Sequence, residues 1–440
     1  LNSVYADFQT NYNKNSAGNY MTWFEMRSDN FIGTTVSSSM PTYAANTNKL
    51  NSSHVSADWN TWYKSISTVN YALHYIPDVQ GLTAIKKDNY LAEAYFLRAF
   101  CYFNLARIWG NVPLVEKPTL SLADVEKPTQ SPQSQVLEFV GKDLEEAVKL
   151  VDEGQNDIFR FSPGALYALY TDYAMWMHDY DKAILYSGKL IDLKRYSLLK
   201  GTEFAQVCAD GTTSENIWTM KWSYQNNKQN WIIYMMCRTS APQMIPSEGV
   251  KNLWNTEEYR MDLRRYQTID TTIVYASNHI SSPNGDASIW KWQPGERVIE
   301  ANEKYVPFYR YADILLLRAE ALNKLQRQEE ALELLNMIRE RAGLSLKTMA
   351  DFTNTPDRIL AMEDAILQER QLELLGEGRR WFDLIRTGRA MKVMNDYFEN
   401  YIEAQTGDVC PRFTEEWQLY WPVYYNNILE NANLVQNGNY

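Results

Sequence analysis

Three glutamates near the end of the sequence, Glu369, Glu373 and Glu377, recur at intervals of four residues. In a helix this spacing puts the three carboxylates on one face. Two opposed carboxylates about 5 to 10 Å apart are the groups that hydrolyse glycosidic bonds. Three arginines accompany the glutamates in the sequence: Arg370, Arg379 and Arg380. We therefore interpret these glutamates as partners in ion pairs that fasten the last helices to the protein, and not as catalytic groups.

Other signals of catalysis are weak. The histidines are His54, His74, His178 and His279, and they lack the paired spacing of a metal site. The sequence contains no HExxH motif, no GxSxG motif, no Walker loop and no Rossmann fingerprint. The sequence therefore predicts that the protein is not an enzyme and that it holds no metal and no cofactor.

Aromatic side chains beside amides offer a different chemistry, because a ring can stack on a flat ligand while neighbouring polar groups bind the ligand's edge. In "SIWKWQPGER", Trp290 and Trp292 lie two residues apart and share one face if the segment is a strand. That face points either to a ligand or into the core. In "WSYQNNKQNWIIYMM", Trp231 and Tyr234 follow a polar loop that precedes either a binding surface or a buried segment.

A third candidate region is the segment 28–58, which is rich in Ser, Thr and Asn. Long loops in compact proteins are commonly functional. This loop offers Asp29, Asn30 and Tyr43 as groups that could bind a ligand. The alternative is a solvated loop with no binding role.

Helices are expected to position these segments. Apolar residues recur every three or four positions in 58–77, 94–108 and 134–151, which predicts amphipathic helices. In the second of these, Gly110 and Pro113 form a stop signal. Four tryptophans are interpreted as core residues: Trp59, Trp62, Trp218 and Trp381.

Two segments, 164–191 and 312–343, repeat a pattern of helix, polar turn and helix. Aligned on Ala183 and Ala331, they carry small or apolar residues at matching positions, as antiparallel packing requires. The period is near that of tetratricopeptide repeats, whose units stack because one unit cannot bury its own apolar face.

The fold class that follows is an all-α helical-repeat scaffold with a mostly irregular, Trp-rich insertion that contains short β segments. We expect one domain, 1–440. Its scaffold comprises 1–200 and 311–399, the insertion spans 201–310, and a non-helical tail spans 400–440.

Charge and hydropathy exclude several classes of partner. The net charge is −11, so no nucleic-acid partner is expected, because phosphate binding needs clustered Lys and Arg. No apolar run approaches the roughly 20 residues of a spanning helix. The spacing of the four cysteines does not fix a cellular compartment, and it leaves a Cys208–Cys237 disulfide open.

Four ordered motifs together resemble the SusD/RagB family of nutrient-binding lipoproteins. The motifs are "AEAYFLRAFCYFNLARIWGNVPLV", "RYADILLLRAEALNKL", "ILQERQLELLGEGRRWFDLIRTGR" and "LYWPVYYNNILENANLVQNGNY". One departure is the segment Tyr424–Asn427, where the family often has Pro-x-x-Glu.

This resemblance implies a tetratricopeptide-like scaffold with a surface glycan-binding site. It implies a lipoprotein on the outer face of the outer membrane of Bacteroidota, which captures oligosaccharide or polysaccharide and passes it to a SusC-like TonB-dependent transporter. The lipidated cysteine of the family is not among these residues, so we expect attachment only through an N-terminal lipid that lies outside them.

Glycan is the ligand that the resemblance favours, and the candidate residues suit it. A pyranose has an apolar face that a ring covers and hydroxyls that Asn, Asp, Gln or Arg bind. Family sites often combine the early loop with the insertion, so all seven residues above are expected to contribute. The alternatives are a peptide-binding member of the same family, a glycoside hydrolase on a helical scaffold, and a protein-interaction adaptor.

Overall fold

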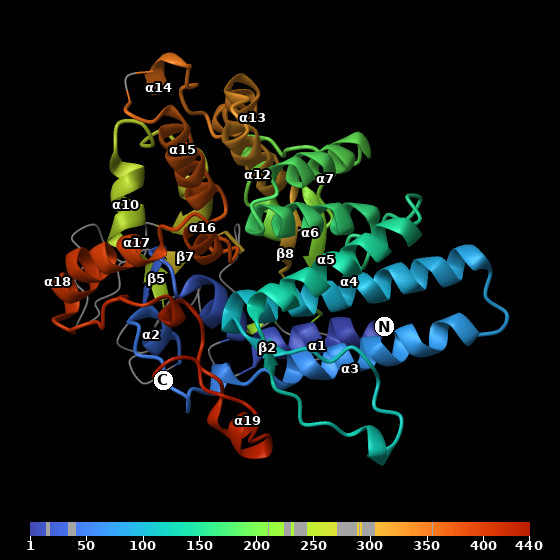
Figure 1. The fold of residues 1–440 in the computed structure, drawn as a ribbon. Coiled ribbons are helices and arrows are strands. Elements are labelled where there is room, and N and C mark those ends of the chain that lie inside the picture. Colours follow the sequence, from blue (N-terminus) through green and yellow to red (C-terminus); the bar gives the residue numbers. More distant parts are fainter. Residues whose placement is uncertain are drawn as a thin grey trace.

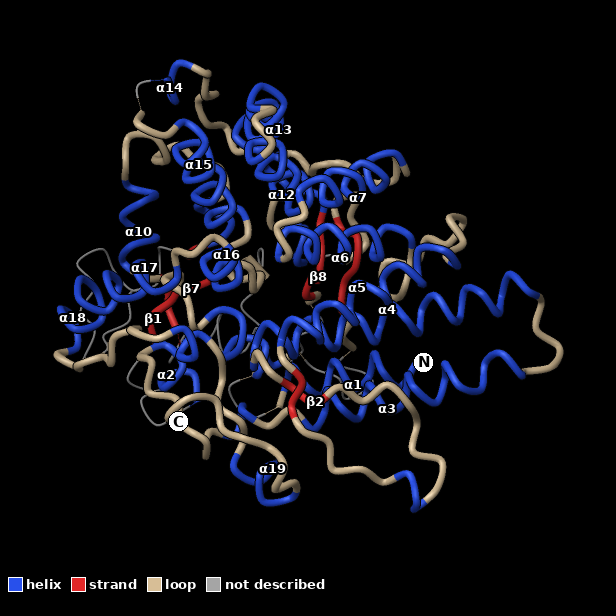
Figure 2. Tube along the Cα trace, in the orientation of Figure 1, coloured by secondary structure: helices blue, strands red, loops and turns tan. Residues whose placement is uncertain are grey.

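The computed structural model of the protein is mainly helical, which confirms the predicted fold class (Figures 1 and 2). It describes residues 1–14, 18–33, 41–209, 211–223, 230–232, 244–270, 288–289, 291–292, 304–353 and 355–440. Within this part of the chain, no helix is both long enough and apolar enough to cross a membrane.

The N-terminal third is a layer of packed helices. They are α1 (Asn2–Asn13), a π-helix (Met21–Glu25), α2 (Pro41–Asn46), α3 (Asn60–Tyr75), α4 (Ala84–Trp109) and α5 (Gln133–Leu150). The first two of these, α1 and the π-helix, are separate elements. Figure 1 shows α3 and α4 as a long antiparallel pair that extends to one side of the molecule.

The aromatic stretch of α4 is scaffold. Thr83 caps the N-terminus of α4 through its side chain, and Gly110 ends the helix with a φ of 75°, a value that favours glycine. From Ala92 to Trp109 every residue except the partly buried Tyr95 is buried, because α3 and α5 both pack on this helix. The buried rings of this stretch are therefore unavailable to a ligand.

The predicted repeats are the hairpins α6 (Pro163–Trp176) with α7 (Tyr180–Asp192), and α12 (Tyr311–Lys324) with α13 (Gln328–Arg341). Ala183 and Ala331 are fully buried at equivalent places. The polar exceptions also fit, since the hydroxyls of Thr171 and Ser187 donate to the carbonyls one turn earlier. Because α12 also packs against α6 and α7, the two hairpins stack as repeat units do.

The C-terminal part continues with α14 (Ala350–Thr353), α15 (Arg358–Glu373), α16 (Arg380–Arg386), α17 (Ala390–Tyr397), a π-helix (Phe398–Glu403), α18 (Ala404–Thr406) and α19 (Tyr425–Glu430). α16 and α17 are separated at Gly388, which has a φ of 71°, a value that favours glycine. The tail after residue 400 is mostly irregular but contains α18 and α19, so the prediction of a non-helical tail is wrong for these short elements.

Short strands pair within and beside the insertion. β4 (Asn216–Met220) pairs with β8 (Val306–Arg310), β6 (Ile269–Asp270) with β7 (Ser288–Ile289), and β1 (Phe31–Gly33) with β5 (Met244–Pro246), all antiparallel. β2 (Val112–Pro113) and β3 (Gln130–Ser131) form a fourth pair. The insertion also holds the helices α8 (Gln206–Ala209), α10 (Glu248–Asn255) and α11 (Arg265–Thr268).

Candidate functional site

The early loop and the insertion, expected to form a site together, are joined by direct pairing. Phe31, Ile32 and Gly33 of β1 lie opposite Pro246, Ile245 and Met244 of β5. The ladder continues at Ser247, whose backbone N–H donates to the carbonyl of Asn30 at 2.8 Å, while its hydroxyl donates to the carbonyl of Asp29 at 2.6 Å. We call this contact between 28–33 and 244–251 the junction.

Side chains of the C-terminal helices bind the early-loop residues of the junction. The Arg380 guanidinium donates to both oxygens of Asp29, at 2.8 and 2.9 Å. Gln371 of α15 donates to Asn30 at 3.1 Å and to Asp29 at 3.3 Å. The Tyr397 hydroxyl donates to the carbonyl of Phe31 at 2.7 Å. The early loop is therefore fixed on both sides.

These contacts change the role of two predicted site residues. Asn30 is buried, its amide N–H donates to Glu25 at 3.0 Å, and its amide oxygen accepts from Gln371. The prediction that Asn30 touches a ligand is therefore wrong, because no face of it is exposed. Asp29 remains partly exposed, but both of its oxygens are bound by Arg380, so its clearest function is to position the loop.

A buried carboxylate lies beneath the same loop. Glu25 of the first π-helix accepts from Asn30 and from the backbone N–H of Gly378. Burial raises the pKa of Glu25 to about 7, because its hydrogen bonds and the nearby Lys291 only partly offset the loss of water. The early loop therefore rests on a group that changes charge near neutral pH.

Tyr43 of α2 is partly exposed and stays a candidate. Its hydroxyl donates to Asp408, and Lys49 lies 5.9 Å from the ring centroid. Burial and the hydrogen bond to Asp408 raise the pKa of Tyr43, so the hydroxyl stays protonated. The ring is thus fixed between α2 and the C-terminal tail, and its exposed part is preorganised for contact.

The prediction that Trp290 and Trp292 share an exposed face that stacks on a ligand is wrong for Trp292. The strand β7 ends at Ile289, so residues 291–292 form a turn, and the Trp292 side chain is 0 % exposed. A ring with no exposed surface cannot stack on a glycan. Trp290, its partner in the prediction, lies outside the described residues.

Trp231 is the predicted ring that the structure places on the surface. Its side chain is 48 % exposed, and its backbone N–H donates to Asn13 at the end of α1 at 3.2 Å. The preceding residue, Asn230, donates to the carbonyl of Lys304 at 2.9 Å. This ring is held at the boundary between the first helix and the insertion. Tyr234, its predicted companion, lies outside the described residues, as does Cys237 of the disulfide that the sequence leaves open.

Most of the described insertion tryptophans build a core. Trp218, Trp222, Trp254 and Trp292 are all buried. Trp218 stacks on Phe308 with ring centroids 4.1 Å apart and meets Phe100 of α4 edge to face, which confirms that it is a core residue. Most tryptophans of the described insertion therefore pack it against the helices, and their number does not indicate where a ligand binds.

The glutamates Glu369, Glu373 and Glu377 form a buried ion-pair cluster, as the structural interpretation predicted. Their partners differ from the neighbouring arginines. The cluster comprises Arg264, Lys291, Arg310, Arg339 and Arg341 with Glu215, Asp262, Glu369, Glu373 and Glu377. The arginines near the glutamates in sequence, Arg370, Arg379 and Arg380, instead bind the aspartates Asp313, Asp383, Asp172 and Asp29.

This cluster joins the insertion to the repeats. Arg264 of the insertion lies 2.6 Å from Glu369 and 3.0 Å from Glu373, while Arg310 of β8 lies 2.7 Å from Glu377. Although burial alone raises the pKa of a carboxyl group, the surrounding cations lower the pKa of Glu373 and of Glu377. All three glutamates are bound by cations of the cluster, so their contacts assign them to positioning the insertion.

Sequence reasoning missed the residues that hold the junction, notably Gln371, Arg380, Ser247 and Glu25. Their partners lie far away in the chain, so no spacing rule connects them. The available signal was local: Glu25 and Asp29 are charged residues inside a segment that is otherwise buried.

The fold and the junction together define a helical-repeat protein with an inserted surface module. The model of the "SusD family" matches residues 218–440, and a model described as "Starch-binding associating with outer membrane" matches residues 1–171. The chain belongs to the SusD family.

Relatives and solved structures agree with this assignment. A SusD-like protein of Formosa agariphila is 29 % identical over 453 residues, which covers 94 % of this chain and 86 % of the relative. A SusD superfamily protein from Bacteroides vulgatus superposes with a TM-score of 0.80 at 17 % identity, covering 100 % of this chain and 98 % of the other. A laminarin-binding SusD-like protein gives a TM-score of 0.78 at 22 % identity, with coverage of 100 % and 98 %.

Proposed function

We propose that the protein is a cell-surface glycan-binding lipoprotein that captures oligosaccharide or polysaccharide and delivers it to a SusC-like TonB-dependent transporter. It binds without hydrolysing. The lipid anchor, the extracellular face of the outer membrane and the transporter partner are parts of this proposal, which family membership supports.

The observation that carries the binding part is the pairing of β1 with β5. The pairing fixes the early loop against the insertion through buried residues, which supports a ligand site shared by the two segments. The bonds among Asp29, Asn30, Gln371 and Arg380 hold the loop in one position, and such preorganisation lowers the entropic cost of binding. We therefore propose residues 201–310 as the ligand-binding insertion.

Trp231 and Tyr43 are the described residues proposed to contact glycan. Trp231 offers a half-exposed ring, and Tyr43 offers a fixed ring edge beside Lys49 and Asp408. A rigid ring covers the apolar face of a sugar at low entropic cost, since it has only two side-chain torsions. Asp29 supports them by holding the loop.

A glycan array followed by calorimetry tests the proposal, with laminarin and starch among the probes. Trp231→Ala is expected to weaken binding tenfold or more, which corresponds to about 1.4 kcal/mol. Tyr75→Ala is the matched control, because Tyr75 is 52 % exposed and is the last residue of α3, outside the proposed contacts. Equal affinity of both variants for the bound glycan would remove Trp231 from the site.

Turnover and the transporter need separate measurements. Overnight incubation with the bound glycan is expected to release no new reducing ends, and their appearance would replace binding with hydrolysis. Co-expression with a SusC-like transporter is expected to give a complex that purifies through a tag on either protein. Recovery of the two proteins only separately would contradict the delivery role.

A further inference from the structure

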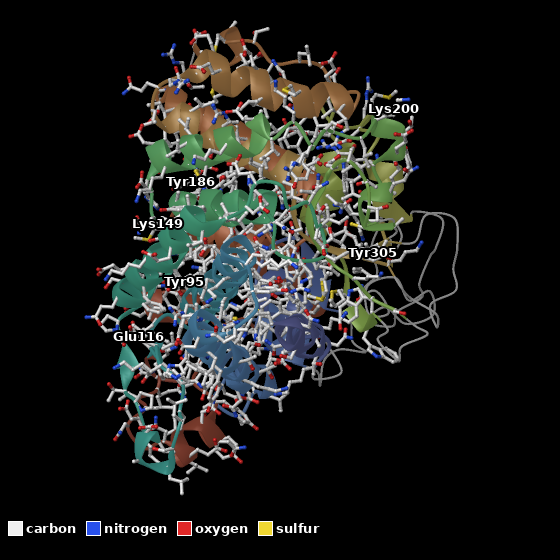
Figure 3. All side chains as sticks on the ribbon, turned by 90° about the vertical axis from the view of Figure 1, so that its right-hand side faces the viewer. Tyr95, Glu116, Lys149, Tyr186, Lys200 and Tyr305 are labelled. Atoms are coloured by element: carbon white, nitrogen blue, oxygen red, sulfur yellow. The ribbon has the colours of Figure 1, made fainter. Side chains whose placement is uncertain are left out.

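A cavity lies among the helical repeats and the C-terminal helices, and it is separate from the junction. Its volume is about 680 Å³, within the range of small-ligand sites. Its walls come from the end of α6, the start of α7, α12, α15, the turn between α16 and α17, and the C-terminal tail. Among the described residues, those that line it all lie outside the early loop and the insertion. Figure 3 shows that Tyr186 of the adjacent α7 and Tyr305 at the edge of the insertion lie on opposite sides of the view.

Two partly exposed rings form one wall of this cavity. Trp176 ends α6, and Phe103 and Phe382 meet it edge to face with centroids 6.2 and 6.1 Å away. Tyr180 begins α7, and the His178 ring stacks on it. Within the described part of the chain, neither the Tyr180 hydroxyl nor the Trp176 indole N–H forms a hydrogen bond. Both donors are therefore available to a guest.

Charged side chains that line the cavity already form ion pairs with one another. Arg386 binds Glu320 with both of its terminal nitrogens, one at 2.8 Å. Lys324 lies 2.6 Å from Glu363. Both cations among the described lining residues are therefore engaged with carboxylates. An anionic guest would have to break one of these pairs, whereas a neutral guest with hydroxyls can share their remaining lone pairs and protons.

The opposite wall is held in shape by the tail. The Tyr420 hydroxyl donates to Gln133 at 3.3 Å, and its ring packs on Gly110 at the end of α4. A Cβ at Gly110 would lie 3.3 Å from that ring, so the close approach depends on glycine. The Tyr420 ring on this wall is therefore held against the end of α4 and, through Gln133, against the start of α5.

From this combination we infer that the cavity binds a short neutral saccharide, independently of the junction. Trp176 and Tyr180 cover an apolar sugar face, while the Tyr180 hydroxyl, Gln133 and the paired carboxylates bind the hydroxyl groups. The inference extends the proposed function, but it does not require the junction to bind. The protein would then hold a polysaccharide at two separated points, which increases its effective affinity.

Fluorine NMR of protein labelled with 5-fluorotryptophan tests the inference. The Trp176 resonance is assigned with Trp176→Phe, and the probes are maltotriose, laminaritriose and mannotriose at millimolar concentration. At least one probe is expected to shift this resonance in a saturable manner. Tyr180→Ala should weaken that response tenfold or more, and Tyr180→Phe should weaken it several-fold through loss of one hydroxyl.

Two further variants distinguish the cavity from the glycan contact proposed at Trp231. Trp231→Ala is expected to leave the Trp176 response intact, and Tyr75→Ala should also leave it unchanged. Loss of the response in Trp231→Ala, or a Trp176 resonance that none of the three sugars moves, would overturn the inference. So would a response to a short peptide in place of the sugars. If sugars bind only through Trp231, the proposed function survives while the second site fails.

Discussion

Asp29 and Arg380, which are 351 residues apart in the chain, form a two-pronged ion pair with distances of 2.8 and 2.9 Å. The pair joins the early loop to the start of α16. Replacing Asp29 or Arg380 by Ala alone is expected to destabilise the protein by about 1–3 kcal/mol, because the remaining charge keeps little water around it. A double-mutant cycle by urea denaturation should give a coupling of about 1–2 kcal/mol.

The same variants show whether Asp29 positions the early loop or contacts the glycan directly. If Asp29 only positions the loop, Asp29→Ala and Arg380→Ala should weaken glycan binding equally. A loss of affinity confined to Asp29→Ala would instead assign Asp29 to the ligand, as the sequence prediction proposed.

Trp292 and Trp231 should respond to mutation in opposite ways. Trp292→Ala removes a fully buried ring and is expected to cost about 3–5 kcal/mol of folding stability. Trp231→Ala removes a half-exposed ring and should leave the melting temperature within a few degrees. Thermal denaturation followed by circular dichroism measures both. A Trp292→Ala variant that stays stable but no longer binds glycan would instead support the sequence prediction that Trp292 stacks on the ligand.

Stability near neutral pH should depend on Glu25. Its pKa in the folded protein is about 7, raised above the ordinary value of 4.5. Because the pKa is raised, the folded protein binds this proton more tightly than the unfolded chain does. The resulting contribution to the free energy of unfolding is complete below pH 4.5 and is lost as the pH rises through 7. For this one group the loss is about 3 kcal/mol. The stability of Glu25→Gln relative to wild type should therefore rise between pH 5 and pH 8.

Glutamine suits this test because its side chain stays neutral at every pH. Asn30 and Gly378 both donate to Glu25, so the amide NH₂ of glutamine loses one of these bonds at all pH values, and only the pH dependence of stability is compared. Chemical denaturation at several pH values supplies the measurement. Parallel pH profiles for the two proteins would mean that Glu25 titrates outside this window.

The buried ion-pair cluster should be sensitive to the loss of one cation. Arg310→Met removes the one cation of the described cluster that binds Glu215, Glu373 and Glu377 together, and the expected cost is about 3–5 kcal/mol. Lys392→Ala is the control, since its pair with Asp396 lies on the surface and Lys392 is 82 % exposed. The control should unfold at the wild-type urea concentration. If Arg310→Met did so too, the cluster would not be what holds the insertion.

Periodicity and motifs predict the scaffold well because its contacts are local or repeat-based. The inward positions of α4 and the matched alanines Ala183 and Ala331 follow from spacing alone. The site is harder, since the direction of a ring depends on distant partners. Trp231 and Trp292 look alike in the sequence, yet one is exposed and the other is buried. The strand that was expected to carry Trp292 ends before it, and no local rule predicts that end.

The pairing of β1 with β5 also has a consequence for how the protein folds. Its strands come from the start of the chain and from beyond its midpoint, so closing that loop costs entropy that local helices do not incur. β1 can form these contacts only when the insertion, α15 and α16 are present, because they supply β5, Gln371 and Arg380. A chain truncated after α7 would therefore lack the junction.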